Sequence, residues 1–291
     1  MTTLTPSLVL AAACLSARAL VAATPPPPVP VAWDAPVQGS SEILPLWREG
    51  PPGGTSGKAL PETLVGTNLS GIHMPAMTVF LPPKPASAAV IILPGGGHRF
   101  LSIEKEGYAV GRWCAAHGLA GIVVTYRLAK EPGSTLTVEN DELHDVQRAV
   151  RLAHMNASRW GFPAPRVGVL GFSAGGELAS LVAMHHDEGD PKAADPVDRE
   201  SCRPFFQALI YPGGSTHILP SAGDPAAFLA AGLMDRPDIS EGVPEAYLRF
   251  KKAGVPVEMH VFTGVGHGFG LGRGLSAAWP ELFGAWLSAL H

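Results

Sequence analysis

The stretch RVGVLGFSAGGELAS, residues 166–180, decides the fold of this chain. Its first residues, as far as Leu170, form an apolar run typical of a buried strand, and the residues after Gly175 have the composition of a helix. Gly171-Phe172-Ser173-Ala174-Gly175 lies between them, a pattern typical of a sharp strand-to-helix turn that lifts the serine hydroxyl clear of a sheet. Free N–H groups at the helix start point to the same place. Ser173 is therefore a candidate nucleophile, with a helix N-cap as the alternative role.

Strand and helix patterns alternate on both sides of this turn. The predicted strands are 77–81, 88–93, 121–126, 166–170, 208–211, 226–231 and 257–262. The predicted helices are 104–117, 138–160, 175–185, 241–253 and 276–290. Apolar strands separated by helices indicate an α/β fold, with a mostly parallel sheet and helices on both of its faces. Ligands of such sheets bind beyond the carboxyl ends of the strands, so functional residues are expected in the loops that follow strands.

Length and composition narrow the class of protein. The 291 residues suffice for one large α/β domain or two small ones, and 46% hydrophobic against 16% charged residues excludes global disorder. The net charge of −4 is spread without a basic stripe, which argues against a nucleic-acid partner. No transmembrane segment is expected, and the sequence sets no oligomeric state. Of the three cysteines, Cys114 and Cys202 lie in the expected domain, and nothing fixes whether they pair.

The first 42 residues differ in composition from the rest. Residues 1–23 contain a short apolar run and the small-residue site Val21-Ala22-Ala23, which predicts a cleaved signal peptide and an exported protein. No Lys or Arg precedes the apolar run, and Cys14 resembles a lipoprotein cysteine, so an unprocessed N-terminus and a lipoprotein stay open. Residues 24–42 begin with a proline-rich run and are predicted to be a stiff linker. The folded domain is predicted over 43–291.

A second polar loop follows the predicted strand 88–93, with the sequence Pro94-Gly95-Gly96-Gly97-His98. Three glycines at a strand end cost chain entropy, and a backbone that must approach a developing oxyanion would require them. We expect the N–H groups of Gly96 or Gly97, together with that of Ala174, to form an oxyanion hole. A phosphate-binding loop is the alternative, but the spacing of such loops is absent. His98 is a candidate substrate contact or a loop residue without one.

The third and fourth polar loops supply a candidate base and acid. His267 lies between two glycines after the strand 257–262, where an imidazole can reach a serine on a neighbouring loop. The acid should follow the strand 226–231, where Asp235 and Asp238 both qualify. Asp238 also fits a capping box for the next helix, which favours Asp235 as the orienting acid. The polar run at 185–188 lacks the pattern of an open metal site, so no metal ligands are expected there.

The chain resembles the small α/β-hydrolase esterases, in particular the feruloyl- and acetyl-xylan-esterase-like (BD-FAE-like) branch. The resemblance covers roughly residues 43–290 and rests on motifs such as LPGGGHRFLSIEKEGYAV, VVTYRL, RVGVLGFSAGGELAS, MDRPDISEG and KKAGVPVEMHVFTGVGHGFG. It implies the α/β-hydrolase fold without a large cap domain, Ser173 as nucleophile, His267 as base, the Gly95–Gly97 loop at the oxyanion hole and Asp235 at the acid position. It also suggests that Arg127 and Asp145 pair beneath that loop.

The resemblance implies a serine carboxylic-ester hydrolase that deacetylates carbohydrate or other short-chain esters and needs no metal or cofactor. The order Ser173, Asp235, His267 along the chain is the one expected for α/β-hydrolases. A serine peptidase of the prolyl-oligopeptidase type, which shares this catalytic domain, is one alternative. A catalytically silent hydrolase fold used for binding is another. The sequence does not name the ester.

Overall fold

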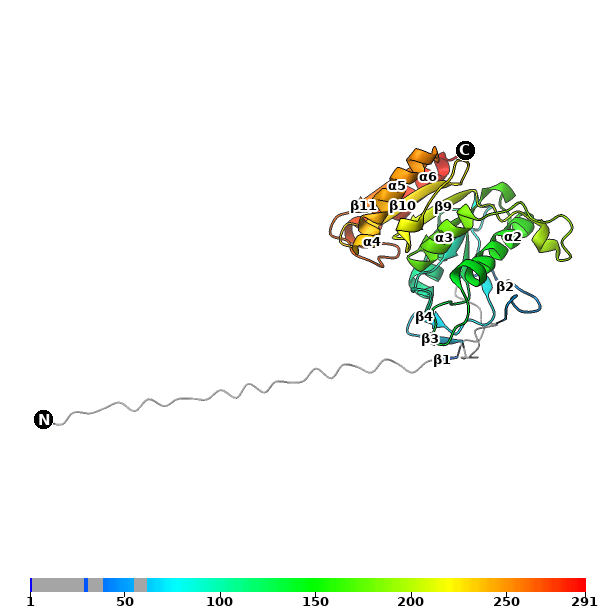
Figure 1. Ribbon diagram of the computed structural model, residues 1–291, viewed down its shortest axis with the longest axis horizontal. Helices are drawn as coiled ribbons and strands as arrows, with labels where there is room; N and C mark the ends of the chain where they lie inside the picture. The colour runs from blue at the N-terminus through cyan, green and yellow to red at the C-terminus, as the bar shows by residue number, and fades with distance from the viewer. Residues whose placement is uncertain (2–28, 31–38, 55–61) are drawn as a thin grey trace.

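The computed structural model describes Met1 and residues 29–30, 39–54 and 62–291 (Figure 1). Apart from Met1, the predicted signal peptide lies outside the described residues, as does most of the predicted linker. The described part of that linker belongs to the fold, because Val29–Pro30 forms β1 and pairs with a later strand. Strand β2 begins at Glu42, one residue before the predicted start of the domain.

Eight strands form the main sheet in the order β11-β10-β9-β8-β6-β7-β5-β2. Their bounds are Glu42–Pro45 (β2), Ala76–Phe80 (β5), Ala89–Leu93 (β6), Ala120–Thr125 (β7), Val167–Phe172 (β8), Phe206–Ile210 (β9), Ala226–Gly232 (β10) and Val257–Phe262 (β11). The strands from β6 to β11 pair in parallel, whereas β5 pairs antiparallel with both β7 and β2. The predicted mostly parallel sheet is therefore confirmed. A separate small sheet joins β1 to β3 (Thr63–Val65) and β4 (Asn68–Ser70).

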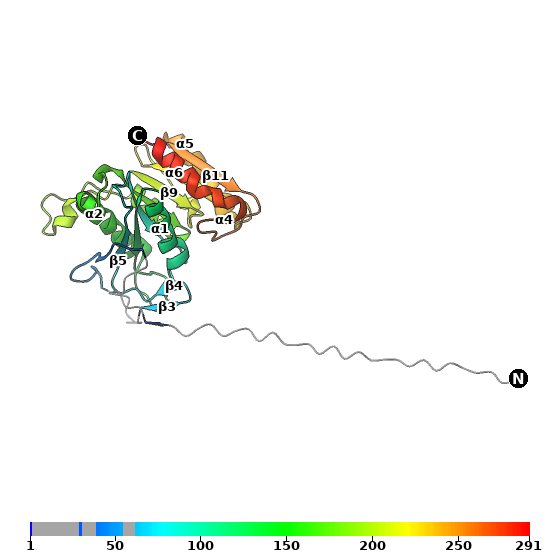
Figure 2. The same cartoon turned by 180° about the vertical axis from the view of Figure 1, so that it is seen from behind.

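Helices cover both faces of the main sheet. They are α1 (Ala109–Ala116), α2 (Leu143–Trp160), α3 (Ala174–Met184), α4 (Pro237–Ser240), α5 (Gly242–Ala253) and α6 (Trp279–Ala289). Figure 1 shows α2, α3 and α5 in front of the sheet, and Figure 2 shows α1 and α6 in front of its other face. Single π-helical turns, Ile103–Tyr108 and Val138–Glu142, lead into α1 and α2. No further domain is inserted between Ala76 and Phe262, a range that the structure describes without a gap.

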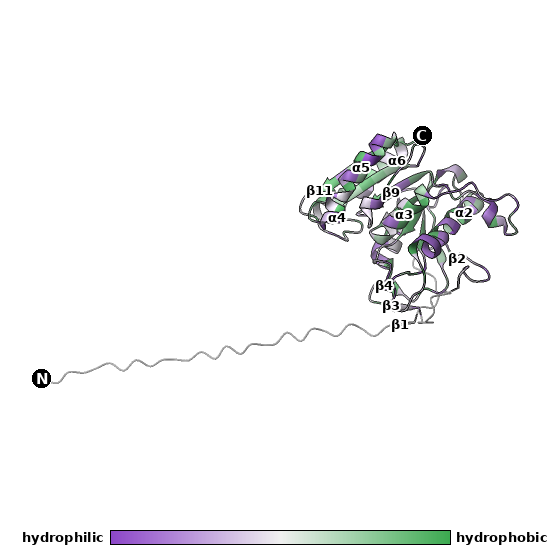
Figure 3. Cartoon of the chain, viewed as in Figure 1, coloured by the Kyte–Doolittle hydropathy of each residue, from purple (hydrophilic) through white to green (hydrophobic). Residues whose placement is uncertain are grey.

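The core lies between the sheet and these helices. Strands β5 to β10 are buried at every position, which explains why their sequences are continuous apolar runs without alternation. Helix α2 is amphipathic instead, and its apolar face, which includes Val146, Ala149 and Val150, packs on the sheet while polar residues face outward (Figure 3). Cys114 and Cys202 are both buried and free, so they do not pair. Among the described residues, no helix is both long and apolar enough to cross a bilayer.

Candidate active site

Ser173 lies at the turn between β8 and α3, where the sequence analysis predicted a strained strand-to-helix connection. Its backbone has φ 51° and ψ −115°, which a non-glycine residue adopts only at a cost of about 1–3 kcal/mol. A Cβ at Gly175 would collide with the carbonyl oxygen of Leu93, so only glycine lets α3 begin this close to the end of β6. The turn therefore places the serine hydroxyl beside the glycine loop that follows β6.

His267 and Asp235 complete a hydrogen-bonded series with this serine. The Oγ atom of Ser173 lies 2.9 Å from Nε2 of His267. The Nδ1 atom of the same ring lies 2.8 Å and 3.0 Å from the two carboxylate oxygens of Asp235. A carboxylate only accepts hydrogen bonds, so Nδ1 carries the proton and Nε2 is left to accept one from the serine. The Asp235 side chain is fully buried, while that of His267 is 35% exposed, and substrate can approach the serine from that side.

Asp238, the other acid that the sequence left open, pairs with Arg236 and not with the histidine. Its carboxylate lies 2.8 Å from Nε of Arg236 and is exposed to solvent. The expected helix-capping role of Asp238 is wrong, because α4 begins at Pro237, whose fixed φ suits a first helical position. Asp238 therefore lies within the first turn rather than before it. The geometry selects Asp235 as the partner of His267.

The glycine loop after β6 is shaped by close backbone contacts. Gly96 has φ +143°, and a Cβ there would collide with the carbonyl of Phe100. The carbonyl oxygen of Gly95 accepts a hydrogen bond from Ser102, which closes the loop. Ala174, the first residue of α3, has an N–H group with no acceptor inside its own helix. The structure thus brings the predicted oxyanion-hole residues to the same edge as Ser173.

A buried pair that the sequence analysis missed, Glu106 and Tyr211, joins this loop to the histidine loop. Glu106 accepts hydrogen bonds from the N–H of Gly95 at 2.9 Å and from the hydroxyl of Tyr211 at 2.9 Å. The Tyr211 hydroxyl accepts in turn from the N–H of Gly270 at 2.9 Å, and its ring packs edge-on against His267. Burial raises the pKa of the Glu106 carboxyl. The only sequence signal was the place of Tyr211, at the end of the predicted strand 208–211.

His98 does not extend into the open site. The residue is 1% exposed, and its ring lies between the carboxylates of Glu142 and Glu177, two further residues that sequence reasoning missed. Both ring nitrogens already have partners, so the side chain has no atom free to bind substrate. The suggested substrate contact is therefore wrong. Glu177 could have been suspected, because it follows Ser173 by one helical turn.

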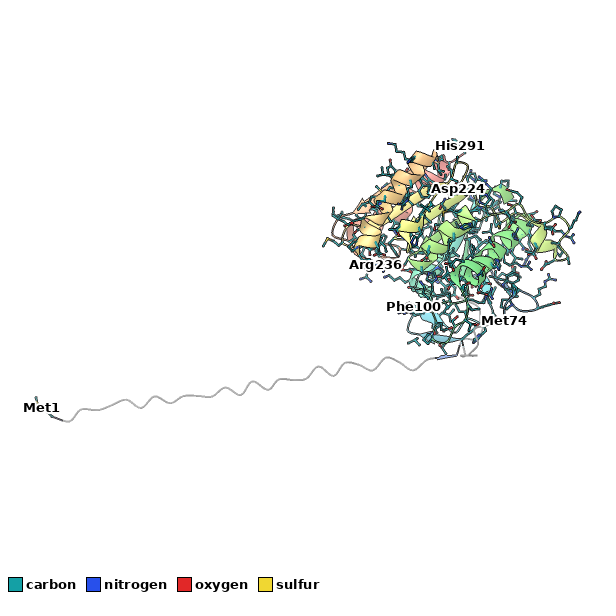
Figure 4. All side chains as sticks on the ribbon, in the orientation of Figure 1. Met1, Met74, Phe100, Asp224, Arg236 and His291 are labelled. Carbon is teal, nitrogen blue, oxygen red and sulfur yellow. The ribbon has the colours of Figure 1, made fainter. Side chains whose placement is uncertain are left out.

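The whole site lies at the carboxyl ends of the parallel strands, as the fold predicts. Figure 4 labels Phe100 and Arg236, from the loops after β6 and β10, at the lower edge of the domain. It labels the C-terminal His291 at the upper end of the domain. Ser173, Asp235 and His267 follow β8, β10 and β11 and contact one another, so these site residues lie together at the carboxyl ends of parallel strands.

Neither a metal-binding cluster nor the groove beside α2 forms part of this site. Within the described ranges, no group of three or more His, Cys, Asp or Glu side chains is arranged to hold a metal ion. In the polar run at 185–188, Asp187 instead pairs with Arg151. A groove of about 1100 Å³ runs along the outer side of α2 past Trp47 and Arg148, but Ser173, His267 and Asp235 do not line it.

The sheet order and the serine turn are those of the α/β-hydrolase fold. Residues 77–209, which include Ser173 but neither Asp235 nor His267, match the BD-FAE family model, in agreement with the resemblance found in the sequence. An acetyl ester-xyloside bifunctional hydrolase from Caldicellulosiruptor lactoaceticus has a similar structure, with a TM-score of 0.74 and 28% identity over 86% of this chain and 96% of that one.

Curated relatives match parts of the sequence, two of them at more than 30% identity. An acetylxylan esterase from Xylanibacter ruminicola is 34% identical over 145 residues, which are 50% of this chain and 26% of that protein. An ethyl acetate hydrolase from Pseudomonas putida is 31% identical over 144 residues, which are 48% of this chain and 41% of that protein. The chain thus spans well under half the length of either relative.

Proposed function

We propose that this protein is a serine carboxylic-ester hydrolase that removes acetyl or other short acyl groups from carbohydrate or small esters. The observation that carries the proposal is the hydrogen-bonded series from Ser173 Oγ through His267 to the buried carboxylate of Asp235. A nucleophile, a base and an orienting acid in contact are the parts that acyl transfer by serine requires. The strained backbone at Ser173 fits a nucleophile held clear of the sheet.

The reaction follows from this geometry in two halves. Ser173 Oγ attacks the ester carbonyl while its proton passes to Nε2 of His267, and the N–H groups of Ala174 and the glycine loop bind the oxyanion. The intermediate collapses, the alcohol leaves with the proton from His267, and the acyl group stays on the serine. Water then attacks the acyl-enzyme with His267 as base, which releases the acid and restores Ser173. Asp235 holds the imidazole orientation and stabilises its charged form.

The names of the relatives support a short acyl group. One relative is called an acetylxylan esterase, another an ethyl acetate hydrolase, and the structural neighbour acts on an acetyl ester. Export, predicted from residues 1–23, belongs to the same proposal, because it would bring the enzyme to acetylated polysaccharide. N-terminal sequencing of the mature protein would test that part.

The test is hydrolysis of p-nitrophenyl esters from acetate to octanoate, with acetate release from acetylated xylan measured in parallel. The proposal predicts that the wild-type protein prefers acetate. In Ser173→Ala the activity should be lost, with kcat lower by a factor on the order of 10⁶ if the three residues act as a unit. A preference for long chains would contradict the short-ester part of the proposal. A folded wild-type protein without activity on any ester would contradict the whole and favour the peptidase or the silent-fold alternative.

A further inference from the structure

His98, at the end of the glycine loop, forms a cluster with two carboxylates, of which Glu142 is buried and Glu177 is 29% exposed. Nδ1 of His98 is 2.6 Å from Oε2 of Glu142, and its Nε2 is 3.2 Å from Oε2 of Glu177. Carboxylates only accept hydrogen bonds, so the ring must donate from both nitrogens, and His98 is an imidazolium. The other oxygen of Glu142 accepts from the N–H of Ala129 at 2.6 Å.

The charge of this cluster argues against a direct electrostatic role in the reaction. One cation faces two carboxylates, so the three side chains together carry a net negative charge. Lys130 and His217 act on Glu177 from outside the cluster and, after the hydrogen bond from His98, help to lower the pKa of that carboxyl. A net negative group would not stabilise a developing oxyanion. The cluster is therefore expected to act by holding neighbouring segments of the backbone in place.

Two residues of the cluster lie close in sequence to the two segments that are expected to supply the oxyanion-hole N–H groups. His98 directly follows Gly97 in the loop after β6, and Glu177 lies on α3, one turn after Ala174. His98 has φ +60°, which is costly for a side chain with a Cβ and persists only where surrounding contacts enforce it. Its two carboxylate contacts and the hydrogen bond from Lys130 N–H to its own carbonyl, 2.9 Å, supply that constraint.

We propose that His98 is a positioning residue that fixes the two halves of the oxyanion hole relative to each other. By bonding to Glu177 it holds the Gly96–Gly97 loop against the start of α3, and by bonding to Glu142 it anchors that loop to the turn before α2. This role rests on the proposed function. Donors to an oxyanion act through their placement in the transition state, so loosening them lowers kcat without weakening substrate binding.

The test compares two variants of the cluster with a matched control. His98→Asn removes the contact with Glu177 but tolerates the left-handed backbone, and Glu177→Gln keeps the side-chain shape while removing its charge. The control, His154→Asn, changes a partly buried histidine on α2 whose Nδ1 contacts the carbonyl of Ser201 instead. The readouts are kcat and KM for p-nitrophenyl acetate and the Ki of a trifluoromethyl ketone, which forms a tetrahedral adduct in the hole.

The proposal predicts that His98→Asn loses about 10–100-fold in kcat, below the 10²–10³ that loss of a whole donor costs. KM should stay within about twofold, and Ki should rise by the same factor as kcat falls. Glu177→Gln should show a smaller change of the same kind, and His154→Asn none. If His98→Asn does not fold, Glu177→Gln decides by the same criteria.

Two results would overturn the positioning role alone. One is wild-type kcat and Ki in folded variants of an active enzyme, and the other is a rise in KM without a change in kcat, which would indicate substrate contact. An inactive wild-type protein would instead overturn the proposed function together with this role.

Discussion

Two buried carboxylates, Glu142 and Asp145, lie three residues apart at the start of α2 and face two different cations. Asp145 accepts hydrogen bonds from Nε of Arg127 at 2.9 Å and from its backbone N–H at 3.0 Å, and also from the indole N–H of Trp47 at 2.8 Å. The pairing of Arg127 with Asp145 that the resemblance suggested is thus confirmed. Glu142 faces His98, which is bonded onward to Glu177.

The two clusters differ in the segment of chain that each cationic side chain holds in place. Arg127 follows β7, and its guanidinium also donates to the carbonyls of Pro52 and Gly54, so its cluster fastens the N-terminal segment to the sheet. His98 belongs to the glycine loop beside Ser173. Both clusters are ion pairs of a cation with carboxylates. We therefore expect the Arg127 cluster to affect the free energy of unfolding and the His98 cluster to affect kcat.

Among the buried carboxylates, the largest effect is expected at a third one, Asp235, which acts on the base directly. Asp235→Asn should lower kcat by about 10⁴-fold while the fold stays intact, because an amide favours the wrong imidazole tautomer. Steady-state kinetics on p-nitrophenyl acetate measures this loss. Asp238→Asn, three residues along on the surface, is the matched control and should keep wild-type kcat. Equal losses in the two variants would contradict the assignment.

Asp145→Asn should be the most destabilising change of the comparison. It removes the closer of the two carboxylates paired with the buried Arg127 and leaves only Asp141, at 3.3 Å, which costs up to about 3–5 kcal/mol of unfolding free energy. Urea unfolding followed by circular dichroism measures that cost, and the kcat of the folded fraction should remain close to that of wild type. If Asp145→Asn lowers kcat as strongly as His98→Asn does, the division between the two clusters is wrong.

Of the two clusters, we expect alkaline pH to reduce the contribution to folding stability of the His98 cluster but not that of the Arg127 cluster. Burial alone would lower the pKa of His98, but hydrogen bonds to Glu142 and Glu177 outweigh it and raise the pKa to about 9. The ordinary value is 6.5, so the stability that this cluster contributes is complete below about pH 6.5 and is lost as the pH rises through 9. The loss is at most about 3 kcal/mol at 1.36 kcal/mol per pKa unit.

Urea unfolding at pH 6 to 10 checks this dependence. Asp145→Asn should keep the decline, because Arg127 stays protonated over that range. His98→Asn should lose the part of the decline that belongs to the cluster. An identical decline in His98→Asn and wild type would show that other groups cause it.

The smallest expected effect is that of Tyr211→Phe. The variant leaves the N–H of Gly270 and the carboxyl of Glu106 without the phenol that joins them, which costs about 1–3 kcal/mol. Because the same phenol supports the histidine loop, we expect kcat to fall by less than about tenfold. Thermal unfolding and kinetics on one preparation would measure both. Wild-type stability would contradict the bridging role.

The sequence predicted the parts of the molecule that repeat a strong local pattern. The strands from β5 to β11 are confirmed to within two residues at each end. Those from β5 to β10 are apolar runs between turn residues, whereas β11, VEMHVF, is only partly buried and alternates apolar with polar residues. Strands β2, β3 and β4 were missed, since they are three or four residues long and only partly buried. The helix starts at 104 and 138 concealed π-helical turns, which have no distinct residue pattern.

The site residues, too, include some that a local sequence pattern predicted and some that it did not. Ser173 and His267 stand in glycine-rich loops after predicted strands, so sequence position alone selected them for the contact that the structure shows. Glu106, Glu142 and Glu177 lie within helical turns, where a glutamate is ordinarily a surface residue. Glu106 and Glu142 are buried and Glu177 partly so, through contacts across 11 to 105 residues of chain, which no local pattern encodes.

Covalent labelling tests the central claim, that Ser173 is a nucleophile activated by His267, most directly. The protein is treated with a dialkyl p-nitrophenyl phosphate, digested and mapped by mass spectrometry, beside Ser173→Ala and His267→Ala. The account predicts a single phosphorylated peptide modified at Ser173, absent in Ser173→Ala and formed far more slowly in His267→Ala. Labelling at another residue, or labelling of Ser173→Ala at the wild-type rate, would contradict it.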